Sequence, residues 1–274
     1  MTHVELEGVR IEVAHIPGPP SKAPLVFLHE GLGSISMWRQ RDRDWPAELC
    51  AATDRAGWLY SRRGYGQSDP VPNVRNAHSP PNHPTALWTT GRHGPDYMHI
   101  EAERVLPALL RSLGVSHPLL IGHSDGATIA LLHAARHPVS ACVAMAPHAF
   151  VEDITIQSIS RARDSFLADG AVLRSRLARH HRDVDNAFWQ WADVWLSAAF
   201  RPFDIRPDCG AITKPALLIQ GVEDEYGSLD QLQDIACAAP HAQTLVLPRC
   251  GHSPHRDAPI AAIEAIRAFV AGLP

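Results

Sequence analysis

The sequence predicts an α/β fold, in which helices cover both faces of a mostly parallel, doubly wound sheet. Short apolar runs bounded by turn residues recur along the chain, and such runs are typical of strands buried in a parallel sheet. Segments with helical periodicity separate them, as crossover helices separate parallel strands. One long segment, residues 148–212, contains only helical patterns and interrupts this alternation between two late strands.

Weak alternation over residues 4–16, broken by Gly8, predicts a β-hairpin. Residues 70–95 are rich in Pro, His and Asn without periodicity, which predicts a long surface loop. The predicted buried strands are 25–28, 58–60, 119–121, 141–146, 216–219 and 244–247, and the predicted helices of the core are 37–52, 99–113, 128–136, 229–239 and 260–270.

The helical segment 148–212 predicts a lid laid over one end of the sheet. It divides the chain into a first part of the core (1–147), the lid (148–212) and a second part of the core (213–274). Within it, residues 187–200 are rich in aromatic rings, which either pack on the main domain or line a substrate pocket. These rings are Phe188, Trp189, Trp191, Trp195 and Phe200, and the candidates for substrate contact are Trp189, Trp191 and Trp195.

The charge pattern argues against a nucleic-acid partner. The formal net charge is −4 and no long basic run occurs. Arg39, Arg41 and Arg43 alternate with Asp42 and Asp44, which predicts a solvated helix face. A looser second group is also diluted by aspartates and predicts a solvated surface, with an anion-steering patch as the alternative. Its members are Arg161, Arg163, Arg174, Arg176, Arg179 and Arg182.

Cysteine usage and hydropathy predict a cytoplasmic protein without a membrane span. The five cysteines are widely spread and form no Cys-x-x-Cys pair, and the N-terminus shows no signal-peptide pattern. We therefore expect reduced thiols in a cytosolic protein. The longest apolar runs are well short of the roughly 20 residues that a membrane helix needs.

The segment Gly122-His123-Ser124-Asp125-Gly126 follows a predicted strand and precedes a predicted helix. In that context G-x-S-x-G predicts a nucleophile elbow, a turn so sharp that side chains two residues before and after the serine would strike neighbouring backbone. Its serine hydroxyl would lie at a helix N-terminus, where developing negative charge is stabilised. The alternative is a Gly-Ser turn without chemistry.

A serine nucleophile needs a base and an acid that orients the base. His252 lies in the loop before the last helix, at the carboxyl edge of the predicted sheet, and His255 is its rival. After the strand 216–219 come three acidic residues, of which Asp224 is the predicted orienting acid. The alternates, for which a solvated loop is the other interpretation, are Glu223 and Glu225.

The oxyanion of a tetrahedral intermediate needs two backbone N–H donors. We expect one from Asp125, the residue after the nucleophile, and the other from the glycine-containing loop 29–34, with Gly31 or Leu32 as the donor.

With these motifs the chain resembles the α/β-hydrolase superfamily over nearly its whole length. It is similar in particular to small bacterial hydrolases that share the sequence motifs HEGLGS (29–34), YSRRGYGQS (60–68) and GHSDG (122–126), and whose natural substrates are poorly defined. The resemblance implies the α/β-hydrolase fold, the order Ser124, Asp224, His252 for the catalytic residues, and a structural turn at 63–68. Two residues depart from the common pattern, Glu30 and Asp125, and each either contacts substrate or ties loops together.

The predicted function is therefore hydrolysis of a carboxylic ester or related acyl bond through an acyl-enzyme on Ser124. No metal and no organic cofactor is expected, and the expected partner is a small molecule with an apolar or aromatic acyl group. A carbon–carbon bond hydrolase or an enol-lactonase is an alternative, although Ser253 stands where carbon–carbon hydrolases often carry tryptophan. A non-catalytic ligand receptor on the same fold is the alternative from another class.

Overall fold

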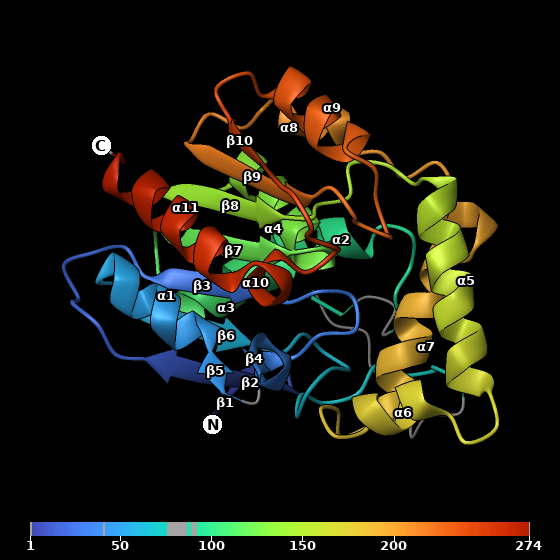
Figure 1. The fold of residues 1–274 in the computed structure, drawn as a ribbon. Coiled ribbons are helices and arrows are strands. Elements are labelled where there is room, and N and C mark those ends of the chain that lie inside the picture. Colours follow the sequence, from blue (N-terminus) through green and yellow to red (C-terminus); the bar gives the residue numbers. More distant parts are fainter. Residues whose placement is uncertain (1, 41, 76–86, 89–91, 274) are drawn as a thin grey trace.

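One mixed sheet organises the chain. In the computed structural model, which describes residues 2–40, 42–75, 87–88 and 92–273, this sheet has eight strands in the order β1-β2-β6-β3-β7-β8-β9-β10 (Figure 1). β1 and β2 form an antiparallel hairpin that turns at Gly8, and β2 is antiparallel to β6, while the other neighbours are parallel. The predicted mostly parallel α/β sheet is confirmed. The strands are β1 (Thr2–Leu6), β2 (Val9–Ile16), β3 (Leu25–Leu28), β6 (Gly57–Tyr60), β7 (Leu119–His123), β8 (Ala141–Met145), β9 (Ala216–Gly221) and β10 (Gln243–Leu247).

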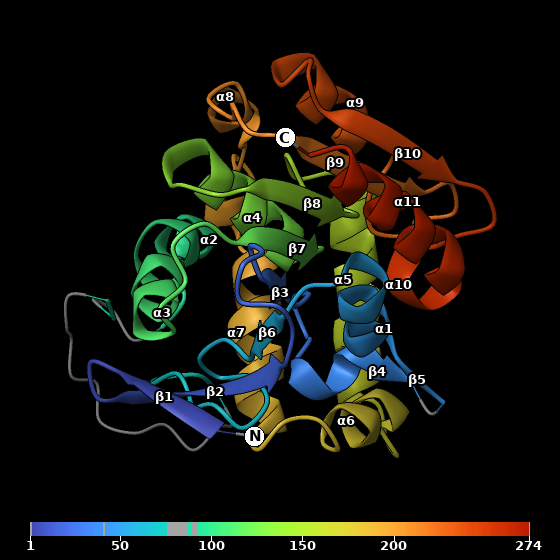
Figure 2. The ribbon, with the colours of Figure 1, turned by 90° about the vertical axis from the view of Figure 1, so that its left-hand side faces the viewer.

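The four central strands β3, β7, β8 and β9 are buried along their whole length, because helices cover both faces of the sheet. Figure 2 shows α1 and α11 on one side of the sheet and α3 and α4 on the other. Successive side chains of a strand therefore enter different cores: Phe27 packs with the α1 and α11 side, and Leu28 with the α4 side. Each such burial contributes about 1.5–3 kcal/mol. The helices of this core are α1 (Trp45–Thr53), α2 (Tyr97–Ile100), α3 (Leu106–Ser112), α4 (Asp125–Arg136), α9 (Asp230–Ala238), α10 (Pro254–Asp257) and α11 (Pro259–Ala271).

The predicted helix 37–52 is wrong in its first half. A 3-10 turn, η1 (Ile35–Trp38), is followed by a small hairpin of β4 (Arg39–Gln40) and β5 (Arg43–Asp44), and α1 begins only at Trp45. The Asp44 carboxylate accepts a hydrogen bond from the N–H of Ala47, and Pro46 is favoured in a first helical turn, so the helix begins there. Arg39 and Arg43 consequently lie on the hairpin and not on a helix face, and Arg41 lies outside the described residues.

The predicted helix 99–113 has a change of register. Between α2 and α3 the chain forms a π-helical turn, η2 (Glu101–Val105). Pro107 lacks the N–H that would continue α-helical hydrogen bonding at this point, which is consistent with the altered register.

The predicted loop 70–95 does not lie wholly on the surface. Val71, Val74 and Trp88 are buried, and the Trp88 indole donates a hydrogen bond to the carbonyl of Leu6 at 3.2 Å. The prediction is wrong at these positions because their apolar side chains pack against the N-terminal hairpin side of the core. Residues 76–86 and 89–91 of this segment lie outside the described residues.

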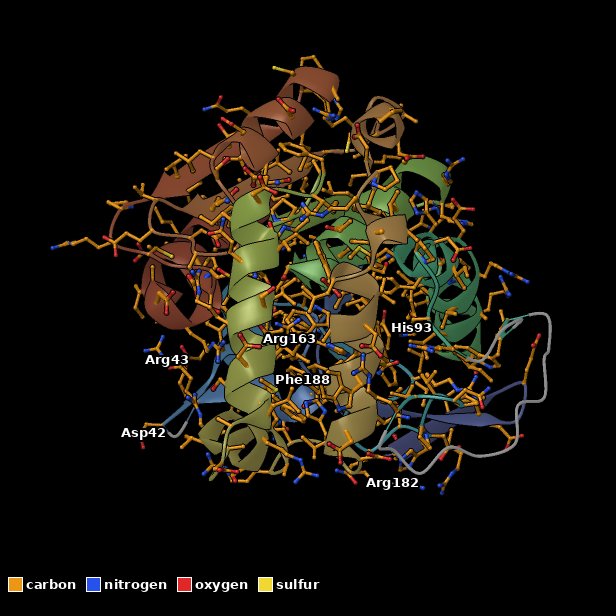
Figure 3. The ribbon with its side chains drawn as sticks, turned by 90° about the vertical axis from the view of Figure 1, so that its right-hand side faces the viewer. Asp42, Arg43, His93, Arg163, Arg182 and Phe188 are labelled. Carbon is orange, nitrogen blue, oxygen red and sulfur yellow. The ribbon has the colours of Figure 1, made fainter. Side chains whose placement is uncertain are left out.

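Between β8 and β9, residues 148–212 form helices and one isolated bridge, and we call this segment the helical insertion. Figures 1 and 3 show α5 and α7 running side by side at the end of the molecule beyond the parallel strands. Phe188 of α7 stacks on Phe166 of α5, with ring centroids 3.8 Å apart, and so joins the two helices. The helical elements are α5 (Asp153–Leu167), α6 (Val172–Leu177), α7 (Val184–Trp195), η3 (Ala198–Phe200) and α8 (Arg206–Cys209).

In the part of the chain that the structure describes, no helix combines the length and the hydropathy needed to traverse a bilayer.

Candidate active site

A sharp turn joins β7 to α4 and presents Ser124. The backbone of Ser124 has φ +53° and ψ −120°, a conformation that non-glycine residues rarely adopt. A Cβ on Gly122 would lie 2.4 Å from the carbonyl oxygen of Gly126, and a Cβ on Gly126 would lie 2.1 Å from that of Leu28. The two glycines thus permit both the turn itself and its close approach to the end of β3.

The ends of three parallel strands bring Ser124, His252 and Asp224 together. Nε2 of His252 lies 2.9 Å from Oγ of Ser124, and Nδ1 of His252 lies 2.8 Å from Oδ1 of Asp224. The backbone N–H groups of Tyr226 and Gly227 donate to the same Asp224 oxygen at 2.8 and 3.2 Å. The carboxylate is therefore fixed opposite the imidazole and cannot easily rotate away.

The alternates for these positions lie elsewhere. Oε2 of Glu225 accepts a hydrogen bond from the backbone N–H of His252 at 3.2 Å, so this carboxylate contacts the histidine loop and not the imidazole. Glu223 is exposed to solvent. The ring of His255 packs between Trp38 and His123, with centroid distances of 4.8 and 4.7 Å.

Electrostatics distinguish His252 from the other buried histidines near it. Burial alone lowers the pKa of His252, but the charge of Asp224 and its hydrogen bond outweigh burial, so this pKa is raised. Burial raises the pKa of Asp224, but the charge of His252 and its hydrogen bond outweigh that effect, and the pKa is lowered. Burial lowers the pKa of His148 to about 3, and the charge of Asp224 offsets this only in part.

The candidate oxyanion donors lie in two loops that meet beside Ser124. The N–H of Gly33 donates to the carbonyl of Glu30 at 3.0 Å, which makes Gly31 and Leu32 the central residues of a turn. Among the hydrogen bonds within the described ranges, none has the backbone N–H of Gly31, Leu32 or Asp125 as its donor. These three N–H groups remain available to a ligand.

The two unusual acids bind protein groups. Oε2 of Glu30 lies 3.4 Å from Nδ1 of His123, and its Oε1 lies 3.7 Å from the Arg256 guanidinium. Asp125 is 1% exposed and accepts a hydrogen bond from the Tyr97 hydroxyl. Both acids also contribute to the wall of a cavity, where Glu30 is partly exposed.

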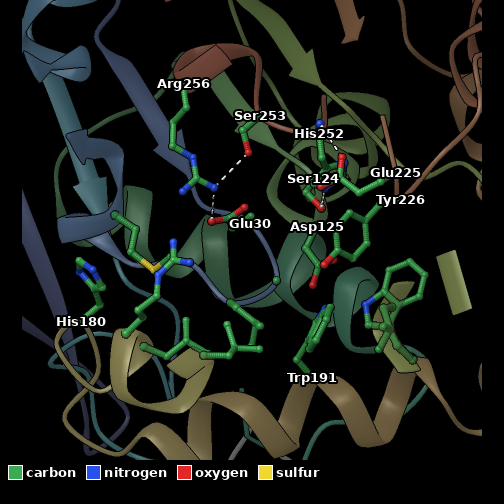
Figure 4. A pocket seen from close by; sticks show the side chains of 18 of the residues that line it. Glu30, Ser124, Asp125, His180, Trp191, Glu225, Tyr226, His252, Ser253 and Arg256 are labelled. Atoms are coloured by element: carbon green, nitrogen blue, oxygen red, sulfur yellow. Dashed lines mark hydrogen bonds and ion pairs between the residues drawn. The ribbon is translucent and has the colours of Figure 1, made fainter. Parts of the chain in front are cut away.

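A cavity of about 500 Å³ lies between the sheet edge and the helical insertion (Figure 4). Ser124 and His252 line it on the sheet side, and Trp191 and Trp195 line it on the side of α7. The apolar side chains of α5 and α6 that complete this wall are Ile159, Leu173 and Leu177.

Trp189, a third candidate for substrate contact, does not line this cavity. Positions 189 and 191 lie two residues apart on α7, which places their side chains on nearly opposite sides of the helix. Trp189 instead packs edge-on against Phe166 and Phe188, and the Arg75 guanidinium lies 4.3 Å from its ring.

Sequence reasoning missed His148. Its Nε2 lies 3.5 Å from Oγ of Ser124, and its ring packs edge-on against Trp195 with centroids 5.0 Å apart. The hydroxyl of Thr128 holds its backbone, accepting from the N–H and donating to the carbonyl, each at 2.9 Å. Its position just after β8 was the available signal, because the carboxyl ends of parallel strands meet at one edge.

Comparison with known proteins identifies the family. The family model described as the alpha/beta hydrolase family matches residues 25–266. Among solved structures, a carboxylesterase of Nitrososphaera gargenis is similar, with a TM-score of 0.74 and 17% identity over 98% of this chain and 97% of that one. The enol-lactonase of Burkholderia xenovorans has a TM-score of 0.69 and 18% identity, covering 98% and 99%. A thermophilic esterase of Thermogutta terrifontis has a TM-score of 0.68 and 19% identity, covering 99% and 97%. From the sheet order, the turn at Ser124 and the match over most of its length, we conclude that this chain belongs to the alpha/beta hydrolase family.

Proposed function

We propose that the protein is a serine hydrolase that cleaves a carboxylic ester or related acyl bond, with Ser124 as nucleophile, His252 as base and Asp224 as orienting acid. One observation carries the proposal: the Ser124 hydroxyl, the His252 imidazole and the Asp224 carboxylate form a continuous hydrogen-bonded series, at 2.9 and 2.8 Å, facing a cavity. Membership of a hydrolase family supports it.

The first half of the reaction forms an acyl-enzyme. Nε2 of His252 takes the proton of the Ser124 hydroxyl as Oγ attacks the substrate carbonyl carbon. The carbonyl oxygen becomes an oxyanion, which accepts hydrogen bonds from the N–H of Asp125 and of Gly31 or Leu32. Collapse of this intermediate breaks the bond to the leaving group, which takes the proton from His252.

The second half releases the acid. His252 takes a proton from water, and the resulting hydroxide attacks the acyl carbon. The bond to Ser124 Oγ then breaks, and the serine recovers its proton from His252. Throughout, the negative charge of Asp224 stabilises the imidazolium and holds the Nδ1–H tautomer.

The helical insertion acts in this proposal as the lid of the acyl pocket. Its Trp191 and Trp195 rings and the aliphatic side chains of α5 and α6 suit an apolar or aromatic acyl group. The unpaired cysteines suit a reducing compartment, and we place the protein in the cytoplasm.

A substrate panel tests the function. Purified protein is assayed on 4-nitrophenyl acetate and butyrate, and on thioester, lactone, amide and vinylogous 1,5-diketone substrates, beside the Ser124→Ala variant. We expect the esters to be turned over well above the variant. Rates equal to those of the variant on every substrate would indicate a binding protein, and turnover of the diketone or lactone alone would indicate carbon–carbon or enol-lactone cleavage.

A further inference from the structure

The end of the cavity farthest from Ser124 is basic. Figure 4 shows His180 at the opposite end of the pocket from Ser124 and His252, with Glu30 lying between them. The basic lining residues come from the β4 hairpin, from α6 and the turn after it, and from α10, which are far apart in the chain. We call them the basic end, and they are Arg39, Arg176, Arg179, His180 and Arg256.

Three of the four arginines of this set act on His180, which also lines the cavity. The charges of Arg179, Arg256 and Arg176, together with burial as the larger cause, lower the pKa of His180. The His180 ring is held in position by the Ser36 hydroxyl, which lies 2.9 Å from its Nδ1. Three guanidinium groups therefore act on one imidazole that lines the cavity.

Of the three acids among the described lining residues, Glu30, Asp125 and Glu225, Glu30 alone forms an ion pair with a member of this set, Arg256. Glu30 lies 3.7 Å from Arg256 and also contacts His123, and Asp125 accepts a hydrogen bond from the Tyr97 hydroxyl. Glu225 accepts from the backbone of His252. Each acid in the wall is thus already engaged.

Two of the arginines have no anionic partner. Arg39 pairs with Asp44 at 2.7 Å, but within the described ranges neither Arg176 nor Arg179 forms an ion pair or side-chain hydrogen bond. Both are exposed at the cavity wall. Unpaired guanidinium groups that share a wall attract an anion and match the planar geometry of a carboxylate.

Neighbouring arginines of the same segment behave differently, which argues against an ordinary solvated surface. Arg174 pairs with Asp185, Arg163 with Asp164 and Arg182 with Asp69. Arg174 and Arg176 lie two residues apart on α6, so their side chains diverge, one toward Asp185 and the other into the cavity wall. Of the arginines of this segment, Arg176 and Arg179 are the two that line the cavity, and neither forms an ion pair within the described ranges. Arg161 also lacks an ion pair there, but it donates to the Ser158 hydroxyl outside this wall.

We propose that the basic end binds a carboxylate at the far end of the substrate. The substrate class is then monoesters of dicarboxylic acids, in which one carboxyl group is esterified and the other is a free carboxylate. This inference rests on the proposed function, since it assigns the other end of the same cavity. In such a substrate the reacting carbonyl lies at Ser124, the apolar middle lies along Trp191 and Leu177, and the carboxylate lies at Arg176 and Arg179.

The kinetic test compares charged and neutral esters. The 4-nitrophenyl monoesters of the C5 to C8 dicarboxylic acids are assayed beside 4-nitrophenyl alkanoates of matching length. We expect a higher kcat/KM for at least one monoester than for its neutral match. In an Arg176→Gln/Arg179→Gln variant that advantage, taken as the ratio of kcat/KM for the charged ester to kcat/KM for the neutral ester, falls on the order of tenfold, mainly through the KM of the charged ester. Added salt should weaken the advantage as well.

Arg174→Gln is the matched control, because it removes one charge from α6 outside the cavity. We expect it to leave kcat/KM unchanged for both the charged and the neutral ester. Equal kcat/KM for charged and neutral esters at every length, or equal loss in the control and the double variant, would overturn the proposal.

A binding measurement separates this inference from the proposed function. Calorimetric titration of the Ser124→Ala variant with adipate and suberate needs no turnover, and we expect binding that the Arg176→Gln/Arg179→Gln substitutions weaken on the order of tenfold. Binding without turnover of any ester would retain the carboxylate site and contradict the hydrolase. Turnover of neutral esters with no dicarboxylate binding would do the reverse.

Discussion

The hydroxyl of Tyr97 donates a hydrogen bond to the carboxylate of Asp125 at 2.5 Å, which holds this acid against α2. The indole N–H of Trp195 in turn donates to the Tyr97 oxygen at 3.1 Å, and the Arg62 guanidinium lies 4.0 Å from the same carboxylate. Arg62 also donates to the carbonyls of His29 and Glu30, at 2.5 and 2.9 Å. Asp125 thus links the turn at Ser124 to the helical insertion and to the loop of Gly31.

Asp125→Ala should destabilise the protein by about 3 kcal/mol, because it leaves the Tyr97 hydroxyl and the Arg62 charge buried without this carboxylate. Urea unfolding followed by circular dichroism measures the change. Asp164→Ala, which removes an exposed acid paired only with its neighbour Arg163, is the control and should leave the midpoint unchanged. A midpoint for Asp125→Ala equal to that of the control would show that the buried contact contributes nothing.

Ser124→Ala should lower kcat by about 10³-fold or more while the protein stays folded, because the attacking oxygen is removed. Steady-state rates on 4-nitrophenyl butyrate and a thermal unfolding curve measure the two parts. Ser253→Ala, one residue from His252 and hydrogen-bonded to Arg256, is a matched hydroxyl deletion that should cost only a few-fold. Undiminished turnover in Ser124→Ala would remove it as the nucleophile.

Asp224→Asn should lower kcat on the order of 10³- to 10⁴-fold, because an amide can hold the imidazole in the wrong tautomer and cannot stabilise its positive charge. Glu225→Gln, in the same loop, removes a charge that faces the backbone of His252 and should cost less than about tenfold. Glu223→Gln should do no more. A larger loss of kcat in Glu225→Gln than in Asp224→Asn would assign the role of orienting acid to Glu225.

Activity on a neutral ester should fall as the pH falls, with a midpoint for kcat/KM above the ordinary histidine pKa of about 6.5. The sign follows from His252: its protonated form cannot accept the Ser124 proton, and its pKa is raised mainly by Asp224 acting against burial. Asp224→Asn should shift the midpoint to lower pH. His148, with a pKa lowered to about 3, stays neutral over this range and adds no second transition to the pH dependence of kcat/KM. A rate that stays flat down to pH 5 would contradict His252 as the base.

Gly126→Ala should destabilise the fold by about 3 kcal/mol, because the added Cβ would lie 2.1 Å from the carbonyl oxygen of Leu28 and backbone must move. Thermal unfolding measures the loss. Gly272→Ala is the control, since its added Cβ would meet nothing closer than 3.6 Å. Equal unfolding temperatures for the two variants would contradict the tight contact between Gly126 and Leu28.

The order of strands and helices was predictable because it depends on local patterns. The predicted strands 25–28, 119–121, 141–146 and 216–219 are apolar throughout, as burial on both faces requires, and they coincide with β3, β7, β8 and β9 to within two residues at each end. The start of α1 was missed although Asp44 and Pro46 signal a first turn, because the alternating arginines and aspartates before Trp45 also suit a solvated helix face.

The sequence by itself determined the parallel sheet, the turn at Ser124 and the loops that carry Asp224 and His252, since each depends on residues adjacent in the chain. Only the tertiary structure decided which groups meet across space. It placed His148 3.5 Å from Ser124. Trp191 lines the cavity, whereas Trp189 packs against Phe166. Arg174 pairs with Asp185, whereas Arg176 forms no ion pair within the described ranges. The physical reason is that periodicity fixes the angle between side chains on one helix, whereas the partner of each side chain depends on how that helix packs against elements far away in the sequence.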